Sequence, residues 1–192
     1  MKFAHIVNPV LVDASSDLFT AQPITFETMR RARANAAPKL HVRLFSAQYA
    51  EDRPVVPADF DQTPDLDRSV LDVAEFKVRR KLPLLKDILD RLYAASDADY
   101  FIYSNVDIAV QPRFYAAVNS FIGAGYDSFV INRRTLPSTY SAVEELEMMY
   151  ADPGQPHPGW DCFVFPRRHY PRYKLFDICL GASRVGLALL AN

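Results

Sequence analysis

The chain has 192 residues, of which 49% are hydrophobic and 23% charged, and its formal net charge is -1. This composition is typical of one soluble globular domain that is large enough to bury a core. The near-neutral charge excludes a global electrostatic attraction to nucleic acid, so we expect no nucleic-acid partner. The N-terminal apolar run ends at Asn8-Pro9, and no stretch approaches the roughly 20 apolar residues of a membrane span. We therefore predict a cytoplasmic protein without a membrane-spanning segment.

The first part of the chain alternates short apolar strands with a helix and a long loop. Phe3 to Val7 is predicted as a buried strand, and Leu40 to Phe45 as a second strand because apolar and polar residues alternate there. Between them, Ile24 to Ala36 is predicted as a helix with Thr25 as its N-cap. The many Pro and Asp residues of Ala50 to Asp67 predict a loop.

A helix, a strand, a helix and a strand follow in order. The residues after Pro83 place leucine and isoleucine at helical period, and the apolar run Tyr100 to Tyr103 predicts a strand buried on both faces. A second helix begins at Pro112 and stops at Gly123, and Ser128 to Ile131 is predicted as another buried strand. Alternating strands and helices predict an α/β fold with a Rossmann-like, mixed and mostly parallel sheet flanked by helices.

The pattern changes in the C-terminal part. Val143 to Tyr150 is predicted as a short helix, Asp152 to Gly159 as a stiff loop rich in Pro and Gly, and Cys162 to Phe165 as a strand. Val185 begins a last apolar helix, and the sequence ends at Asn192 without a capping residue. We therefore predict a single domain over residues 1–192, with the alternative that the natural chain continues beyond it.

Polar residues follow each of the first four predicted strands directly. In open α/β sheets, ligands bind outside the carboxyl ends of the strands, so these positions are candidates for a site. They are Asn8, Ser46, Ser104 to Asp107, and Asn132 to Arg134.

Asn105 and Asp107 form the most informative pair. They lie two residues apart at the end of a buried strand, and in extended backbone side chains two apart point the same way. A carboxylate there can hold a hard divalent cation that bridges two phosphates, and an amide can bind a ribose or a metal-bound water. The alternative is that both residues only cap the turn before Pro112.

Tyr100 to Asp107 resembles the strand and Asp-x-Asp-type motif of glycosyltransferase A fold enzymes. The resemblance extends by element order from Lys2 to Ile131, and Asn105 stands where the family often has an acid. It implies a glycosyltransferase A type fold whose donor is a nucleotide-diphosphate sugar bound through Mn²⁺ or Mg²⁺, with Asp107 as the metal ligand and Asn105 as a donor contact. Asn8, after the first strand, resembles the family's nucleotide-contacting loop.

The loop His157-Pro158-Gly159-Trp160-Asp161 is a second candidate. The resembling family has a Gly- and Trp-containing loop with an acid that binds the acceptor and supplies the general base. This implies that Asp161 is the catalytic base and that His157 and Trp160 bind a hydroxyl-bearing acceptor. A carboxylate there can take the acceptor hydroxyl's proton, and an indole can stack on a sugar face. The alternative is that Trp160 fills the core, Asp161 caps a turn and His157 is solvated.

Three basic stretches each have a functional and a structural interpretation. Arg133 and Arg134 are predicted to bind the donor diphosphate, because guanidinium groups match phosphate oxygens, or else they flank a strand end on the surface. The side chains of Arg79 to Lys81 either point into the donor site or are exposed to solvent. Arg167 to Lys174, which carries two tyrosines, either binds an anionic group or nucleic acid or is a surface loop.

Missing motifs exclude several enzyme classes. The sequence has no glycine-rich dinucleotide-binding turn, no phosphate-binding loop and no nucleophile elbow. Its four histidines lack metal-ligand spacing, and Cys162 and Cys179 are predicted as buried free thiols. Three hypotheses remain: a glycosyltransferase, a nucleotidyltransferase of related fold, and a non-catalytic nucleotide- or sugar-binding module. A nucleotidyltransferase would need a glycine-rich loop after the first strand, and none follows Asn8.

Overall fold

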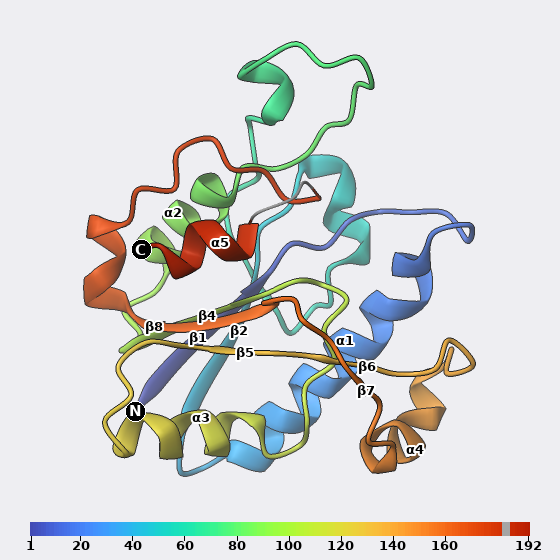
Figure 1. Cartoon of the computed structure of the whole chain (residues 1–192), viewed down its shortest axis with the longest axis vertical. Coiled ribbons are helices and arrows are strands. Elements are labelled where there is room, and N and C mark those ends of the chain that lie inside the picture. Colours follow the sequence, from blue (N-terminus) through green and yellow to red (C-terminus); the bar gives the residue numbers. More distant parts are fainter. Residues whose placement is uncertain (182–184) are drawn as a thin grey trace.

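A six-stranded sheet forms the centre of the molecule, in a computed structural model that describes residues 1–181 and 185–192. The strands lie in the order β3-β2-β1-β4-β8-β5 (Figure 1). Their bounds, in chain order, are β1 Lys2–Val7, β2 His41–Ser46, β3 Asp61–Gln62, β4 Tyr100–Ser104, β5 Phe129–Ile131 and β8 Cys162–Pro166.

Strand direction in this sheet is mixed. Neighbouring strands from β3 to β4 pair in parallel, whereas β8 pairs antiparallel with both β4 and β5. Strand β5 therefore points the same way as β4. The mixed and mostly parallel α/β sheet predicted from the sequence is confirmed.

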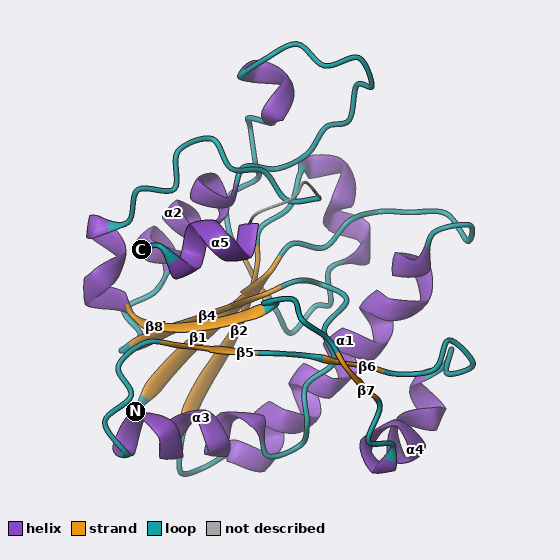
Figure 2. Ribbon diagram, in the orientation of Figure 1, coloured by secondary structure: helices purple, strands orange, loops and turns teal. Residues whose placement is uncertain are grey.

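Helices cover both faces of the sheet and make three layers (Figures 1 and 2). Helices α1 (Asp17–Ala36) and α3 (Phe114–Gly123) pack on one face, and α2 (Leu85–Ala95) and α5 (Val185–Leu190) pack on the other. The strands supply both faces because successive side chains point to opposite sides. In β1, for example, Phe3 belongs to the first apolar cluster and Ala4 to the second.

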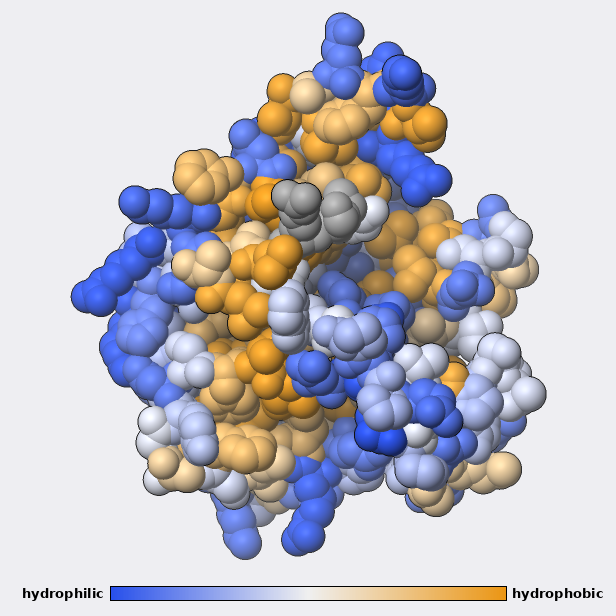
Figure 3. Space-filling model, in the orientation of Figure 1, coloured by the Kyte–Doolittle hydropathy of each residue, from blue (hydrophilic) through white to orange (hydrophobic). Residues whose placement is uncertain are grey.

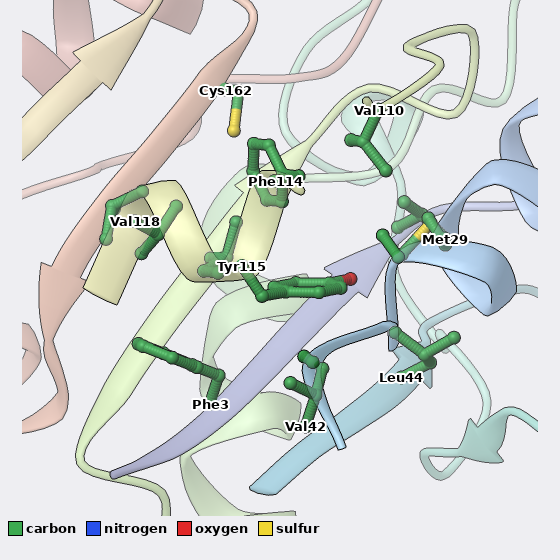
Figure 4. Close-up of a cluster of buried hydrophobic side chains, with 14 of the residues drawn as sticks. Phe3, Met29, Val42, Leu44, Val110, Phe114, Tyr115, Val118 and Cys162 are labelled. Carbon is green, nitrogen blue, oxygen red and sulfur yellow. The ribbon is translucent and has the colours of Figure 1, made fainter. Parts of the chain in front are cut away.

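The core between the sheet and helices α1 and α3 is densely aromatic and aliphatic. Figure 4 shows Phe3, Val42 and Leu44 of the sheet facing Met29 of α1 and Tyr115 of α3. All five side chains are buried. Burial of each large apolar side chain contributes about 1.5–3 kcal/mol to the free energy of folding. This packing holds the sheet in place, and the polar loops extend from one of its edges.

Helix α1 begins earlier than predicted. It starts at Asp17, and its N-cap is Ser16, whose Oγ accepts a hydrogen bond from the Leu18 N–H at 3.3 Å. Thr25, the predicted cap, lies buried inside the helix. Pro23 lies inside this helix and cannot donate a backbone hydrogen bond to the Phe19 carbonyl oxygen.

Two other predicted elements differ in detail. The predicted loop at 50–67 contains the 3₁₀ helix Ala50–Val55 and the short strand β3, which pairs with β2. Strand β5 is half-buried instead of buried, because it is the edge strand of the sheet. Two more 3₁₀ helices span Val70–Asp72 and Arg167–Arg172.

The chain between β5 and β8 leaves the sheet and returns to it. This excursion contains the two-stranded pair β6 (Arg134–Thr135) and β7 (Gln155–Pro156), the 3₁₀ helix Val143–Glu145 and helix α4 (Leu146–Ala151). Between α4 and β7, Gly154 has a φ of +55°, and a Cβ there would lie 2.8 Å from the Thr135 carbonyl oxygen. Only glycine lets the two strands approach so closely.

The segment 73–82 protrudes from the end of the molecule drawn at the top of Figure 1. Figure 3 shows hydrophobic and hydrophilic residues side by side there. Val73, Phe76 and Val78 are exposed, and Arg79 and Arg80 are exposed beside them.

Candidate functional site

Three neighbouring strand ends bring the candidate residues together. Strand β8 lies between β4 and β5 and is antiparallel to both. Its first residue therefore lies at the edge of the sheet where β4 and β5 end. Neighbouring strands are about 4.8 Å apart, which places Asn105, Asp161 and Arg133 within side-chain reach. The backbone N–H of Asn105 donates to the Asp161 carbonyl oxygen at 3.3 Å.

The guanidinium of Arg133 joins the group. Its Nη1 lies 3.2 Å from Asp161 Oδ1 and 3.9 Å from Asp107 Oδ2. Its Nη2 lies 3.1 Å from His157 Nε2. Arg133 therefore touches side chains from two of the loops that the sequence marks as candidates.

His157 cannot satisfy both of the donors that face it. Its Nδ1 accepts a hydrogen bond from the Gly159 N–H at 2.9 Å, and its Nε2 faces the Arg133 guanidinium. A neutral imidazole has one acceptor nitrogen, and a guanidinium only donates. When Gly159 uses the acceptor, Arg133 Nη2 faces a protonated ring nitrogen, and this contact is then not a hydrogen bond.

Asp161 is the most buried carboxylate of the group, with 8% of its surface exposed. Its Oδ1 accepts from Arg133 and lies 3.5 Å from Asn105 Nδ2. Among the described residues, its Oδ2 has no hydrogen-bond partner, and the Nδ1 of the His157 imidazole lies 3.8 Å from it. A buried carboxylate oxygen without a partner is costly, which favours a ligand proton donor at this position.

Asn105 and Asp107 have different surroundings. Asn105 Oδ1 accepts a hydrogen bond from the Tyr103 hydroxyl at 3.1 Å, which orients the amide toward Asp161. Burial raises the pKa of the Tyr103 phenol well above its usual value, so it stays a donor. The Asp107 side chain is 40% exposed and open to solvent or a ligand.

In this arrangement an arginine contacts both carboxylates. The sequence predicts Mn²⁺ or Mg²⁺ at Asp107, and Arg133 Nη1 lies 3.9 Å from Asp107 Oδ2 and 3.2 Å from Asp161 Oδ1. Within residues 1–181 and 185–192, no three His, Cys, Asp or Glu side chains are grouped for a metal. The metal stays a prediction, and positive charge at this place comes from Arg133.

Three predicted site residues lie outside this group. Asn8 is buried, and its Nδ2 donates to the Ala47 carbonyl oxygen at 2.7 Å, which ties the end of β1 to the end of β2. Arg134 points the other way and donates to the carbonyls of Pro153 and Gly154. Trp160 is 38% exposed, and it packs against α5, where a Cβ on Gly186 would lie 3.2 Å from the Trp160 Cβ.

The other basic stretches make local contacts. Lys81 pairs with Glu51 and lies over the Tyr49 ring, away from the Arg133 group.

The Arg167–Arg172 turn is part of the fold. Arg167 donates to the Ser96 and Tyr93 carbonyl oxygens, and Arg168 pairs with Asp127. Tyr170 is buried, with its hydroxyl on Asp90.

A buried hydrogen-bond chain next to the site has no counterpart among the predicted residues. His5 Nδ1 lies 2.9 Å from the Tyr115 hydroxyl, and His5 Nε2 lies 2.8 Å from Ser104 Oγ. Burial lowers the pKa of His5 to about 3, so the imidazole is neutral at physiological pH. The sequence signal was a histidine inside an apolar strand. This chain fixes the end of β4, directly before Asn105.

Cys162 is buried in the core, as predicted, and burial raises the pKa of its thiol to about 12. Cys179 is also a free thiol, but it is only half-buried. A thiol with so high a pKa does not act as a nucleophile near neutral pH. Among the helices that the structure describes, none is long and apolar enough to cross a membrane.

No protein-family model matches the chain, and no curated protein matches its sequence. Solved structures share its fold. The bifunctional IspDF of Campylobacter jejuni superposes with a TM-score of 0.51 at 8% identity, over 100% of this chain and 47% of the other. A proposed nucleotide-diphospho-sugar transferase of Desulfovibrio desulfuricans superposes with a TM-score of 0.50 at 11% identity, over 98% and 74% of the two chains.

A third structure, 4-diphosphocytidyl-2C-methyl-D-erythritol synthase of Anaerococcus prevotii, gives a TM-score of 0.47 at 9% identity, over 92% of this chain and 78% of the other. At these identities the likeness concerns the fold alone. The chain shares the α/β fold of the Campylobacter jejuni and Desulfovibrio desulfuricans structures.

Proposed function

We propose that the chain is a glycosyltransferase that moves a sugar from a nucleotide-diphosphate sugar to a hydroxyl group. One observation carries the proposal. A guanidinium and a buried carboxylate with an unpartnered oxygen lie 3.2 Å apart at the carboxyl edge of the sheet. The first can bind an anionic leaving group, and the second can take a proton from an attacking hydroxyl.

Arg133 binds the donor diphosphate in this proposal. A guanidinium forms paired hydrogen bonds to phosphate oxygens and neutralises the charge that develops as the diphosphate leaves. In the same proposal, Asn105 and Asp107 bind hydroxyl groups of the ribose or of the donor sugar. The Mn²⁺ or Mg²⁺ implied by the family resemblance is the competing source of positive charge.

Asp161 is the general base. Its Oδ2 removes the acceptor hydroxyl's proton while that oxygen forms a bond to the anomeric carbon. The bond between this carbon and the diphosphate oxygen breaks, and the nucleoside diphosphate leaves with the electron pair. A single displacement of this kind inverts the anomeric carbon. His157 contacts Arg133 and lies 3.8 Å from the Asp161 carboxylate, and Arg133 holds Asp161 Oδ1 in place.

Calorimetric titration with UDP, GDP, CDP and ADP, in EDTA and then in Mn²⁺, tests the donor site. At least one nucleoside diphosphate should bind in EDTA. Arg133→Ala should weaken its affinity by about 10- to 100-fold, since charge-assisted hydrogen bonds contribute about 1.5–3 kcal/mol. Arg134→Ala is the matched control, because that guanidinium bonds Pro153 and Gly154. Equal losses in both variants would refute the role of Arg133, and binding only with Mn²⁺ would favour the metal.

The identity of the leaving group separates this function from a nucleotidyltransferase. A glycosyltransferase releases a nucleoside diphosphate from a nucleotide sugar, whereas a nucleotidyltransferase releases pyrophosphate from a nucleoside triphosphate. The segment from Asn8 to Ser16 contains no glycine with which to surround a triphosphate. Pyrophosphate release from any of the four nucleoside triphosphates would overturn the proposal.

A further inference from the structure

A cavity of about 630 Å³ opens beside the Arg133 group. Its walls come from the start of α1, the segment 107–111, the segment 131–138 and helix α4. Asp107 and Arg133 line its border, and Cys162, the neighbour of Asp161 in the chain, lines it as well. Its volume falls within the roughly 300–1,000 Å³ that small-molecule sites occupy.

The walls of this cavity are largely apolar. Ile24 of α1, Ile108, Leu136, and Leu146 and Met149 of α4 all line it. Ile24, Leu146 and Met149 also form a small buried cluster, separate from the two main apolar clusters, that holds α4 against α1. These apolar side chains would leave any hydroxyl that faces them without a partner, which is costly. The lining fits a molecule with an apolar body.

Polar side chains also line the cavity, among them Asp17, Gln111, Asn132, Thr135, Tyr140 and Asp152. Asp107 and Arg133 lie at the end next to Asp161. Two other lining side chains, Thr25 and Tyr150, have buried hydroxyl oxygens without a hydrogen-bond partner among the described residues. Rotation of the Thr25 side chain exchanges its methyl and hydroxyl groups, so an occupant with one or two polar atoms can be accommodated there.

We propose that this cavity binds the apolar body of an alcohol, aromatic or alicyclic in character, whose hydroxyl lies at the Asp107 and Arg133 end. Arg133 lines this end of the cavity and also contacts the Asp161 carboxylate, so the guanidinium connects the two. The role of this alcohol as the acceptor rests on the proposed function, whereas its binding in the cavity does not. The acceptor class of the transferase is therefore a hydrophobic alcohol and not a free sugar.

A cavity-filling variant tests the binding. Ala21 lines the cavity from α1, and Ala34 is exposed on the same helix and does not line it. Calorimetry with 4-cyclohexylphenol should show binding to the native chain, at least about a tenfold loss in Ala21→Trp, and no change in Ala34→Trp. Glucose should not bind. If Ala21→Trp fails to fold by circular dichroism, Ala109→Trp fills the cavity from an exposed position of the 107–111 segment.

The outcomes separate the two proposals. Absence of 4-cyclohexylphenol binding, or binding that neither tryptophan variant weakens, would overturn the cavity assignment. If 4-cyclohexylphenol binds as expected but no nucleoside diphosphate binds, the cavity assignment stands and the proposed glycosyltransferase function is refuted. If both bind and the phenol is not glycosylated with any nucleotide sugar whose diphosphate binds, the cavity stands and the acceptor assignment is overturned.

Discussion

Removing the Arg133 guanidinium should destabilise the protein through Asp161. In Arg133→Ala, a carboxylate that is 8% exposed loses the cation that contacts its Oδ1 at 3.2 Å. Hydrogen bonds to charged groups contribute about 1.5–3 kcal/mol, and solvent screens this pair in part because the Arg133 side chain is 30% exposed. We expect a loss of about 1–2 kcal/mol in the free energy of unfolding, or about 2–8 °C in Tm for a chain of this size.

A double-mutant cycle isolates the contact. Arg133→Ala, Asp161→Asn and the double variant are unfolded in urea and followed by circular dichroism. Asp161→Asn should cost less in the Arg133→Ala background than in the native chain, with a coupling free energy of about 1 kcal/mol. Arg134→Ala should show no coupling to Asp161→Asn, because its guanidinium bonds backbone carbonyls across the β6–β7 pair. Additive effects of Arg133→Ala and Asp161→Asn would refute the reasoning.

Three further predictions concern turnover, pH and the start of α1. Asp161→Asn should lower the turnover of a nucleotide sugar by roughly a hundredfold or more, as measured by single-turnover kinetics. Calorimetry should show little change in nucleotide affinity. Unchanged turnover per folded molecule would make Asp161 a structural residue. In the folded chain, burial lowers the pKa of His5 to about 3, whereas in the unfolded chain His5 takes up a proton near pH 6.5. The unfolded state therefore gains protons as pH falls below about 6.5. The contribution of neutral His5 to the free energy of unfolding is complete above that pH and is lost as pH falls toward 3. Relative to His5→Gln, the native chain should therefore lose up to about 1.4 kcal/mol per pH unit below pH 6 in urea unfolding, and parallel pH profiles would contradict this. Ser16→Ala should lower the free energy of unfolding by about 1 kcal/mol, since Ser16 caps α1, and no change in the urea midpoint would show that the cap contributes nothing.

The fold was predictable to the extent that it rests on periodicity. Tyr100 to Tyr103 is buried on both faces, and the leucine spacing after Pro83 places α2 correctly from Leu85 to Ala95. The start of α1 was missed because Pro23 suggests a break, although Ser16-Asp17 is an ordinary cap signal. Periodicity carries no information on strand direction, so the antiparallel course of β8 could not be derived.

The candidate site depends on that direction. Asp161 precedes its strand, so in a wholly parallel sheet it would lie at the opposite edge from Asn105 and Arg133. The polar residues that follow the strands predicted the correct edge of the sheet for the site. They did not predict which side chains contact each other there. Asn8 follows β1 and bonds the Ala47 backbone, and Arg134 follows Arg133 and turns away. Only the spatial neighbours of each strand end decide which of these side chains meet.

The excursion between β5 and β8 starts and finishes on adjacent strands of the sheet. Loop-closure entropy grows slowly with length when the two attachment points are fixed side by side, so inserts of very different size can span them at similar cost. Arg133 and Asp161 stand at the two attachment points, whereas Leu136, Leu146 and Met149, which shape the cavity, belong to the insert itself. Grafting a different insert between Arg133 and Asp161 should therefore change which alcohols bind, while the sheet, Arg133 and Asp161 are retained.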